Sequence, residues 1–275
     1  NSDRTERDFL FINPKIGASY SLNENSSVYA SYGIAGREPT RADIFGGLDA
    51  VYGFNYQNII SEDSMQSETV NDLEIGYNFN SANIRLQLNA FYMDFDNEIS
   101  VVGGLANNSY VFIRQNVASS QRYGLEMNLE LEPVENLNFR LMATYLETNV
   151  NEFDNGVETL NNVEHAFAPN LNIRPEVSYT LFNKLTLGFG SRYLSESFME
   201  LSNDPDFIIP ESMIFNSWLS YQLNEIINMG IWLNNITDEV YFTDGAPTFN
   251  ANGGLEPGYR IQAPRNVFGK VELRF

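Results

Sequence analysis

The residues of this chain that could do chemistry are few, and they do not form a catalytic set. His165 is the only histidine and cysteine is absent, which excludes a multi-histidine site, a thiolate metal site and a disulfide. Any Ser-His-Asp triad would have to use His165, which lies beside Glu164 in a long inter-strand segment and is expected to be solvated. We therefore predict no enzyme activity and no cofactor. Haem stays a lesser alternative, because Tyr as well as His can ligate its iron.

Acidic side chains occur in groups that could be mistaken for metal or acid/base sites. Ca²⁺ takes six to eight oxygen ligands, and two clusters carry such oxygens: Asp94, Asp96 and Glu98, and Asn203, Asp204 and Asp206. Neither has the spacing of an EF-hand loop, so solvated carboxylates and no metal site are expected. A third set alternates along one stretch and is interpreted as a polar, water-lined wall: Glu126, Glu130 and Glu132.

The candidates for ligand binding lie in the first long inter-strand segment. Arg37 and Arg41 could bind carboxylate or phenolate-type oxygens in bidentate fashion. The alternative is that these arginines bridge neighbouring acidic loops. Tyr52, Phe54 and Tyr56, spaced by two, could form an aromatic ligand surface or simply a loop hairpin, and the hairpin is expected.

Strands with alternating polarity must position these residues. Successive strand side chains point to opposite faces, so the stretch around 84–92 has one apolar and one polar face. The pattern recurs near 125–132, 185–193, 227–234 and 266–275. The apolar face should carry Leu86, Leu88, Leu125, Met127, Leu129, Leu187, Ile231 and Val271. The polar face should carry Arg85, Gln87, Glu126, Glu130, Arg192 and Glu272, while Trp232 and Phe268 interrupt the pattern by falling on it.

We predict an all-β fold of about eleven antiparallel strands, near 14–22, 27–36, 67–79, 83–96, 110–132, 137–149, 169–182, 185–196, 212–223, 226–236 and 266–275. Short turns alternate strictly with long links at 37–66, 97–109, 150–168, 197–211 and 237–265. Short turns at one end and long loops at the other are typical of transmembrane β-barrels of the bacterial outer membrane. Alternation alone would also fit a soluble β-sandwich with one solvent-exposed face.

Composition agrees with this assignment. Among 275 residues, acidic side chains outnumber basic ones 36 to 16, and a net charge of −20 should repel nucleic-acid phosphates. No segment approaches the ~18 consecutive apolar residues of a membrane helix, and the mean hydropathy is −0.28. A hydropathy scan does not detect barrel strands, because the hydropathies of alternating lipid-facing and lumen-facing residues cancel within any window. The aromatic content of 13% fits two interfacial girdles.

Motifs along the whole chain resemble, in family order, the C-terminal barrel of TonB-dependent outer-membrane receptors. They are Asn13–Gly17, Tyr29–Gly33, Arg37–Arg41, Leu73–Tyr77 after Glu68, Phe91–Phe95, Asn116, Arg122–Glu126, Leu233–Glu239 with Tyr241, and Pro264–Asn266 before the final strand. The terminal strand resembles the signal read by the barrel-assembly machinery, carried here by Val271, Leu273 and Phe275.

The resemblance implies a fold, a function and partners. Residues 1–275 would form one receptor β-barrel domain, about the C-terminal half of a 22-stranded barrel, with the plug domain and the TonB-contacting N-terminal region absent. An odd strand count also favours an incomplete barrel, because single-chain bacterial barrels normally have an even number. The implied function is active import of a scarce nutrient, most often a ferric siderophore, across the outer membrane, energised by the TonB complex.

The sequence is also compatible with three other functions. The first alternative is a passive porin or adhesin-type outer-membrane barrel. The second is an outer-membrane protease or phospholipase, which a single loop histidine disfavours. The third is a soluble glycan-binding β-domain, which would need no detergent and would contact no outer-membrane lipid.

Overall fold

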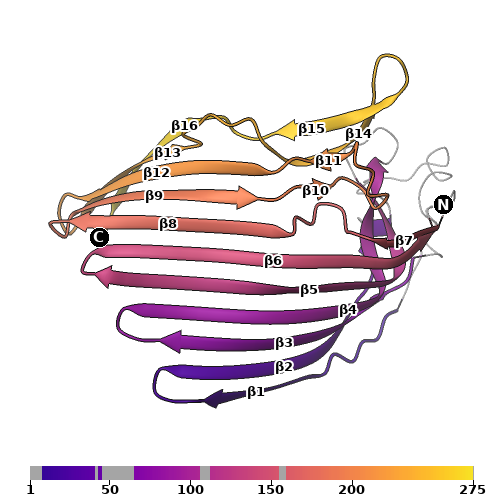
Figure 1. Ribbon diagram of the computed structural model, residues 1–275, viewed down its shortest axis with the longest axis horizontal. Coiled ribbons are helices and arrows are strands. Elements are labelled where there is room, and N and C mark those ends of the chain that lie inside the picture. Colours follow the sequence, from indigo (N-terminus) through magenta and orange to yellow (C-terminus); the bar gives the residue numbers. More distant parts are fainter. Residues whose placement is uncertain (1–7, 41–42, 45–64, 106–111, 155–158, 275) are drawn as a thin grey trace.

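The computed structural model contains one antiparallel sheet of twelve strands, eleven of which are neighbours in chain order, while the short strand Thr159–Val163 pairs only with Leu137–Asp154 (Figure 1). The structure describes residues 8–40, 43–44, 65–105, 112–154 and 159–274. The eleven strands in chain order are β1 (Lys15–Ser21), β2 (Ser26–Arg37), β3 (Glu68–Asn80), β4 (Ile84–Leu105), β5 (Phe112–Val134), β6 (Leu137–Asp154), β8 (Leu171–Leu181), β9 (Leu185–Leu194), β12 (Ser212–Gln222), β13 (Ile227–Asn234) and β16 (Asn266–Leu273). The predicted all-β fold and its eleven strands are confirmed. In the described residues no helix has the length and apolar character to cross a membrane.

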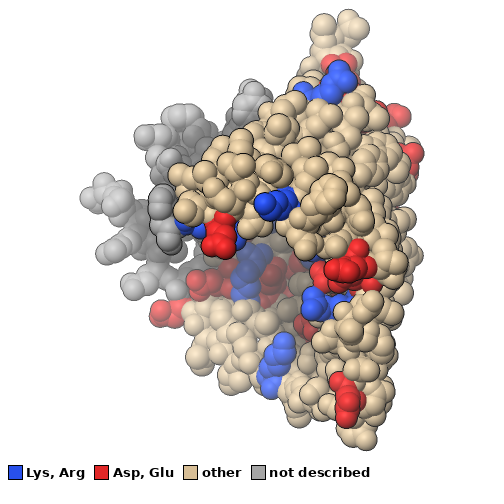
Figure 2. Space-filling view, turned by 90° about the vertical axis from the view of Figure 1, so that its left-hand side faces the viewer, with Lys and Arg blue, Asp and Glu red and all other residues tan. Residues whose placement is uncertain are grey.

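The sheet is open and curled into a trough. Each strand pairs with the next, but β1 and β16 have a neighbour on one side only within the described chain, so the barrel is not closed. Figure 2 looks along the trough from the end of the short turns and shows charged side chains gathered in its hollow. Much of the outer wall in that view carries neither acidic nor basic residues.

Short and long connections lie at opposite ends of the sheet, as predicted (Figure 1). The tight turns use residues that accept a left-handed backbone: Asn136 has φ 67°, and Phe182 and Asn183 have φ 51° and 53°. Asn adopts this conformation more readily than most residues, and paired positive φ values match the twist of a hairpin. The turns thus fix the register of each hairpin.

The register confirms the predicted faces. Leu88 of β4 lies directly opposite Tyr77 of β3 on one side and Met127 of β5 on the other, so one apolar row crosses three strands. One residue along, Gln87 falls on the opposite face and lines the hollow, in a cavity of about 250 Å³. Leu88 is 40% exposed, which leaves its side chain free to contact lipid or another apolar surface.

The inner face carries a row of alternating charges near the turn end. Arg85, Glu130, Arg140 and Glu176 are direct cross-strand neighbours from β4 to β8. Arg85 lies 2.7 Å from Glu130, and Arg140 lies 3.3 Å from Glu130 and 3.5 Å from Glu176. Opposite charges placed directly across a sheet stabilise the pairing of its strands.

The interruption at Trp232 and Phe268 has a structural reason. Trp218, Trp232 and Phe268 are cross-strand neighbours on the inner face of β12, β13 and β16, and the rings of Trp232 and Phe268 lie 5.8 Å apart. Gly188 of β9 leaves room for the ring of Trp218, since a Cβ there would collide with it. The polar wall therefore contains one aromatic row beside the edge strand.

The long links contain more structure than the sequence indicated. The β4–β5 hairpin continues far beyond residue 96, so the expected loop 97–109 is largely strand. Five further strands occupy the other long links: β7 (Thr159–Val163), β10 (Ser197–Phe198), β11 (Ile208–Ile209), β14 (Phe242–Phe249) and β15 (Leu255–Ile261). The prediction of about eleven strands did not include these short strands, because their sequences show little alternation of polarity.

Two small hydrophobic cores join these links into one loop layer. The first core contains Val117, Val150, Phe153, Val163 and Leu201, contributed by β5, β6, β7 and the 197–211 link. The second contains Met199, Phe207 and Ile209, with Phe167, Phe242 and Tyr259 packed against them. Burial of such side chains is worth about 1.5–3 kcal/mol each. Contacts between links thus hold the layer together.

Candidate functional site

The candidate site lies at the loop end of the hollow, where the loop layer meets the inner wall. A cavity of about 430 Å³ opens there between β4, β5, β6 and the 165–172 segment. Polar groups from several elements line it, among them Arg114, Arg122, Thr144, His165 and Asn172. A concave site with a few convergent polar groups is the usual form of a small-molecule site.

Glu98 is the central carboxylate of this site. Its Oε2 lies 2.7 Å from His165 Nε2, and both side chains are only 5% exposed. Arg122 and the Ser120 hydroxyl donate to the same carboxylate from β5. The backbone N–H of His165 donates to Thr148 Oγ1 of β6 at 3.0 Å. Glu98 therefore connects β4 and β5 to the segment that leads into β8.

The charges around Glu98 control its ionisation. Burial acts to raise the pKa of this carboxyl, but the hydrogen bond and charge of His165, together with Arg122 and Ser120, outweigh burial. The pKa of Glu98 consequently lies below its ordinary value. A carboxylate with a lowered pKa stays charged at neutral pH and keeps its partners in place.

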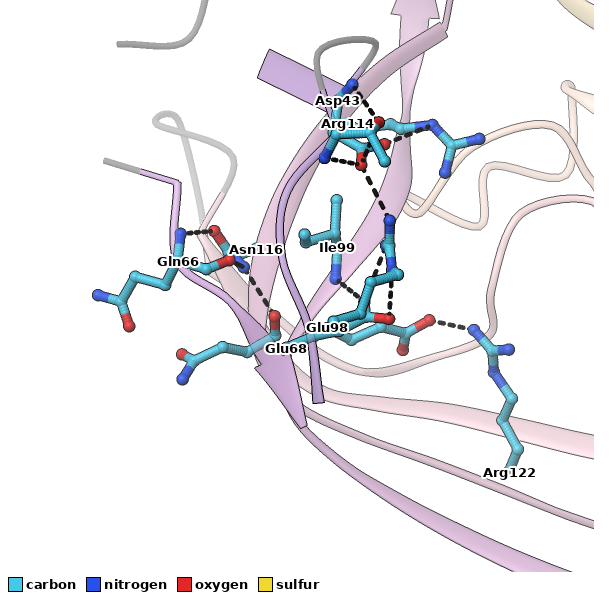
Figure 3. Close-up of polar contacts among 11 residues, drawn as sticks. Asp43, Gln66, Glu68, Glu98, Ile99, Arg114, Asn116 and Arg122 are labelled. Carbon is cyan, nitrogen blue, oxygen red and sulfur yellow. Dashed lines mark hydrogen bonds and ion pairs between the residues drawn. The ribbon is translucent and has the colours of Figure 1, made fainter. Parts of the chain in front are cut away.

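A second ionic cluster lies beside the first and is drawn in Figure 3. Arg37, at the end of β2, donates from Nε to Glu68 Oε1 at 2.7 Å and from Nη2 to Glu68 Oε2 at 3.1 Å. Its Nη1 reaches Asp43 Oδ2 at 2.9 Å, and Arg114 lies 3.6 Å from the other oxygen of Asp43. Glu68 Oε2 also accepts the backbone N–H of Ile99 at 2.8 Å.

This second cluster anchors the start of the first long link. Asp43 is 5% exposed and accepts the backbone N–H and the hydroxyl of Thr40, at 2.9 and 2.8 Å. Burial tends to raise the pKa of Asp43, yet Thr40 and Arg37 lower it below its ordinary value. The two clusters together form a band of paired charges across the loop end of β2 to β5.

The candidate residues from the sequence are only partly placed. Arg37 bridges Glu68 and Asp43, as the second of the two interpretations proposed, and its contact with a ligand stays a prediction. Arg41, Tyr52, Phe54, Tyr56 and Phe275 lie outside the described residues. Val271 and Leu273 of the terminal strand share the outer face and are 62% and 51% exposed.

Two expectations about solvated residues were wrong. His165 is buried rather than solvated, because Glu98 and Thr148 satisfy its Nε2 and backbone N–H within the loop layer. Glu98 is likewise buried and paired rather than solvated. Asn203 Oδ1 accepts the backbone N–H of Glu164 at 2.6 Å, which ties the 197–211 link to the segment before β8. Within the described ranges no group of three or more His, Asp or Glu side chains could hold a metal ion.

The residues that contact Glu98 and Asp43 were not predicted from the sequence. Arg122, a partner of Glu98, appeared only within a motif, and neither Ser120, its other partner, nor Arg114, which contacts Asp43, was singled out. A hint was present, since His165 is followed by the largely apolar run Ala166–Pro169. A polar residue next to such a run is often buried together with the run. Because buried polar groups are almost always hydrogen-bonded, a buried partner for His165 was to be expected.

Comparisons with known proteins agree with this geometry. A family model described as TonB dependent receptor-like, beta-barrel matches residues 1–236. A TonB-dependent siderophore receptor of Acinetobacter baumannii, PiuA, is 23% identical over 85% of this chain and 31% of its own length. The ferripyoverdine receptor of Pseudomonas aeruginosa is 24% identical over 84% of this chain and 27% of its own length.

Solved structures show the same fold. The crystal structure of PiuA from Acinetobacter baumannii superposes with a TM-score of 0.69 at 19% identity, covering 94% of this chain and 35% of that one. The ferric yersiniabactin receptor FyuA of Yersinia pestis gives 0.67 at 17% identity, over 95% and 37%. The chain spans about a third of the length of the curated relatives it matches. The chain belongs to the TonB-dependent receptor-like β-barrel family.

Proposed function

We propose that this chain forms part of the wall of an outer-membrane receptor that actively imports a scarce nutrient. The observation that carries the proposal is the trough, with an apolar outer face, a charged inner face and all long links at one end. Such a wall suits a lumen filled with water or polar groups inside and lipid outside. Family membership and the relatives named as siderophore receptors support import over a structural role.

The proposed ligand is a ferric siderophore. Both curated relatives are named as receptors for siderophores, one of them for ferripyoverdine. The cavity at the loop end is lined by hydroxyl and amide groups and by the paired charges of Glu98, His165 and Arg122, which suits hydrogen bonding to the oxygen-rich surface of such a chelate.

We also propose ligand contacts in the first long link. Arg37, Arg41, Tyr52, Phe54 and Tyr56 follow or border the anchored segment at Thr40 and Asp43. Arg41→Gln should weaken ligand affinity without lowering thermal stability, whereas Arg37→Gln should lower both, because Arg37 also fixes Glu68 and Asp43. Unchanged affinity in Arg41→Gln and in a triple Tyr52, Phe54 and Tyr56 to Ser variant would refute these contacts.

The proposed partners follow from the same wall. Outer-membrane lipid would cover the apolar face, and the barrel-assembly machinery would read the terminal strand through Val271, Leu273 and Phe275. The edges of β1 and β16 expose unpaired N–H and C=O groups, each costing several kcal/mol in lipid. We infer that further strands pair with them, so that residues 1–275 supply about half of a barrel. The TonB complex would contact the protein outside this wall.

Uptake measurements test the function. Deletion of the gene should abolish accumulation of radio-iron presented as a ferric siderophore, and the gene supplied on a plasmid should restore it. A proton ionophore, or deletion of the host's TonB protein, should stop the uptake as completely. Ligand entry that persists without an energised inner membrane would instead favour a passive pore.

A further inference from the structure

Two arginines face each other across neighbouring strands of the inner wall. The β8–β9 register pairs Ile173 with Tyr193 and Asn172 with Leu194, which places Arg174 directly opposite Arg192. Arg174 shares a face with Asn172, and Arg192 pairs with Ile214 of β12. Like charges directly opposite one another destabilise strand pairing.

These two arginines differ from the rest of the described chain in having no carboxylate partner. Every other described arginine lies within 4.0 Å of a carboxylate: Arg37, Arg85, Arg114, Arg122, Arg140, Arg260, Arg265 and Arg274. In a protein with 36 acidic residues and 16 basic ones, such a pair is unexpected. Because the two positive charges lie close together and repel each other, leaving them without a carboxylate partner costs more free energy than leaving a single arginine unpaired.

The local surroundings do not supply that anion. Arg174 Nε reaches only the side-chain oxygen of Asn172, at 3.3 Å, and Arg192 Nε is buried without a hydrogen-bond partner in the described structure. Glu176, two residues along the face of β8, is bonded to Arg140. The ionisable groups close enough to influence Arg192 are Arg174 and the phenol of Tyr241.

Open space lies beside Arg174. A cavity of about 290 Å³ is lined by Arg174 together with Asn172, Thr144, Asn128 and Glu126. Hydroxyl and amide groups can complete the hydrogen bonding of an oxygen-rich solute held by a guanidinium. The cavity lies on the same inner face as the loop-end site, between that site and the row of alternating charges.

We propose that Arg174 and Arg192 form an anion site on the inner wall, which binds a carboxylate or phosphate-type group of the transported solute. The proposal rests on the proposed function, because it takes the trough to be the import path. Two planar guanidinium groups can each hold an oxyanion through paired hydrogen bonds, and charge on the solute would offset their mutual repulsion. Rings of Arg and Lys side chains select anions in anion and phosphate pores, and the same attraction acts between two arginines and an anionic group.

Phosphate binding to the intact, detergent-purified protein tests the site. Inorganic phosphate is titrated at constant ionic strength against chloride, and affinity is followed by calorimetry. The double variant Arg174→Gln/Arg192→Gln should bind phosphate about 10- to 100-fold more weakly, as expected for the loss of charge-assisted hydrogen bonds. The control Arg85→Gln lies on the same wall but is already paired with Glu130, so it should leave phosphate affinity unchanged.

Thermal unfolding of the same variants separates a solute site from an internal ion pair. Removing two mutually repelling, unpaired charges should leave the unfolding temperature unchanged or raise it. A clear loss of stability would mean that a carboxylate elsewhere in the intact protein occupies the pair, and the proposal would be overturned. Equal phosphate affinity in all variants, or none in any, would overturn it as well.

Failure of this site and failure of the proposed function give different results. Energy-dependent uptake of ferric siderophore by the unmodified protein, with no phosphate effect, would reject only the arginine site. Phosphate binding that depends on Arg174 and Arg192, without any energy-dependent uptake, would keep the site and reject the proposed function.

Discussion

His165 Nε2 and Glu98 Oε2 lie 2.7 Å apart, although 66 residues separate them in the sequence and both side chains are buried. The pair joins the β4–β5 hairpin to the segment before β8. Since Arg122 and Ser120 donate to the same carboxylate, Glu98 is the residue on which these contacts converge.

Replacing Glu98 should therefore loosen the loop layer. Glu98→Ala leaves Arg122 and His165 without their carboxylate, and breaking a buried ion pair costs roughly 3–5 kcal/mol. Hydrogen exchange should speed up at the amides of 97–102 and 159–168. The control Glu130→Ala removes a half-exposed partner of Arg85 and should cost no more than about 1 kcal/mol. Equal exchange in the two variants would show that Glu98 does not fix the layer.

Acid should loosen the same contacts. The pKa of Glu98 is lower in the folded protein than its ordinary value, so its contribution to stability is present above that ordinary value, about 4.3. The contribution is lost as the pH falls through the lowered folded pKa. The protection factors of the amides at 97–102, which correct for the intrinsic exchange rate at each pH, should thus fall in acid in the unmodified protein and depend much less on pH in Glu98→Gln. A pH dependence identical in both would contradict the assignment.

Glu164 should respond in the opposite sense. Burial, and then repulsion from Glu147 and Glu196, raise its pKa, so its ionised form at neutral pH weakens the folded state. This cost appears as the pH rises through the raised folded pKa and is absent in acid. Glu164→Gln should raise the unfolding temperature at neutral pH and have little effect below pH ~4. A lower unfolding temperature at neutral pH would disprove the expected sign.

The two faces of β4 should tolerate charge very differently. Leu88→Arg would place a charge on the apolar outer row and should cost roughly 2–4 kcal/mol at mid-bilayer depth. Gln87→Arg, one residue away on the inner face, should cost much less. Refolding of the intact protein into lipid vesicles with a denaturant series measures both, and equal costs would reject the proposed lipid face.

Gly188 should be hard to replace. Its missing side chain leaves room for the ring of Trp218, and even a Cβ would collide with that ring. Gly188→Val should thus lower stability by about 1–3 kcal/mol, as overpacking typically does. Combination with Trp218→Ala should recover much of the loss. Additive losses in the double variant would show that the two residues do not share this space.

Local patterns were sufficient to predict the sheet. Leu86, Gln87 and Leu88 alternate on a single strand, and turns such as Asn183–Lys184 set the register of each hairpin, so these features are encoded within a few neighbouring residues. The opposition of Arg174 and Arg192 follows from that register, yet the missing carboxylate partner becomes visible only in three dimensions.

The loop layer could not be predicted in the same way. Leu201 packs against Val117 of β5 and Val150 of β6, both more than fifty residues away in the sequence, and no periodic pattern in its own segment indicates this contact. His165 is similar, because its burial depends on Glu98. Contacts between distant segments depend on tertiary packing, and local sequence propensity does not predict them.

The shared cores of the loop layer also limit how such a receptor can be re-engineered. Leu201 is 0% exposed among side chains of β5, β6 and β7, so grafting residues 197–211 alone from a relative would leave either a cavity or a steric clash. Exchange of ligand preference between receptors should succeed only when the links around both cores are transplanted as a set. Chimaeras in which a single link is replaced should therefore be recovered as misfolded protein.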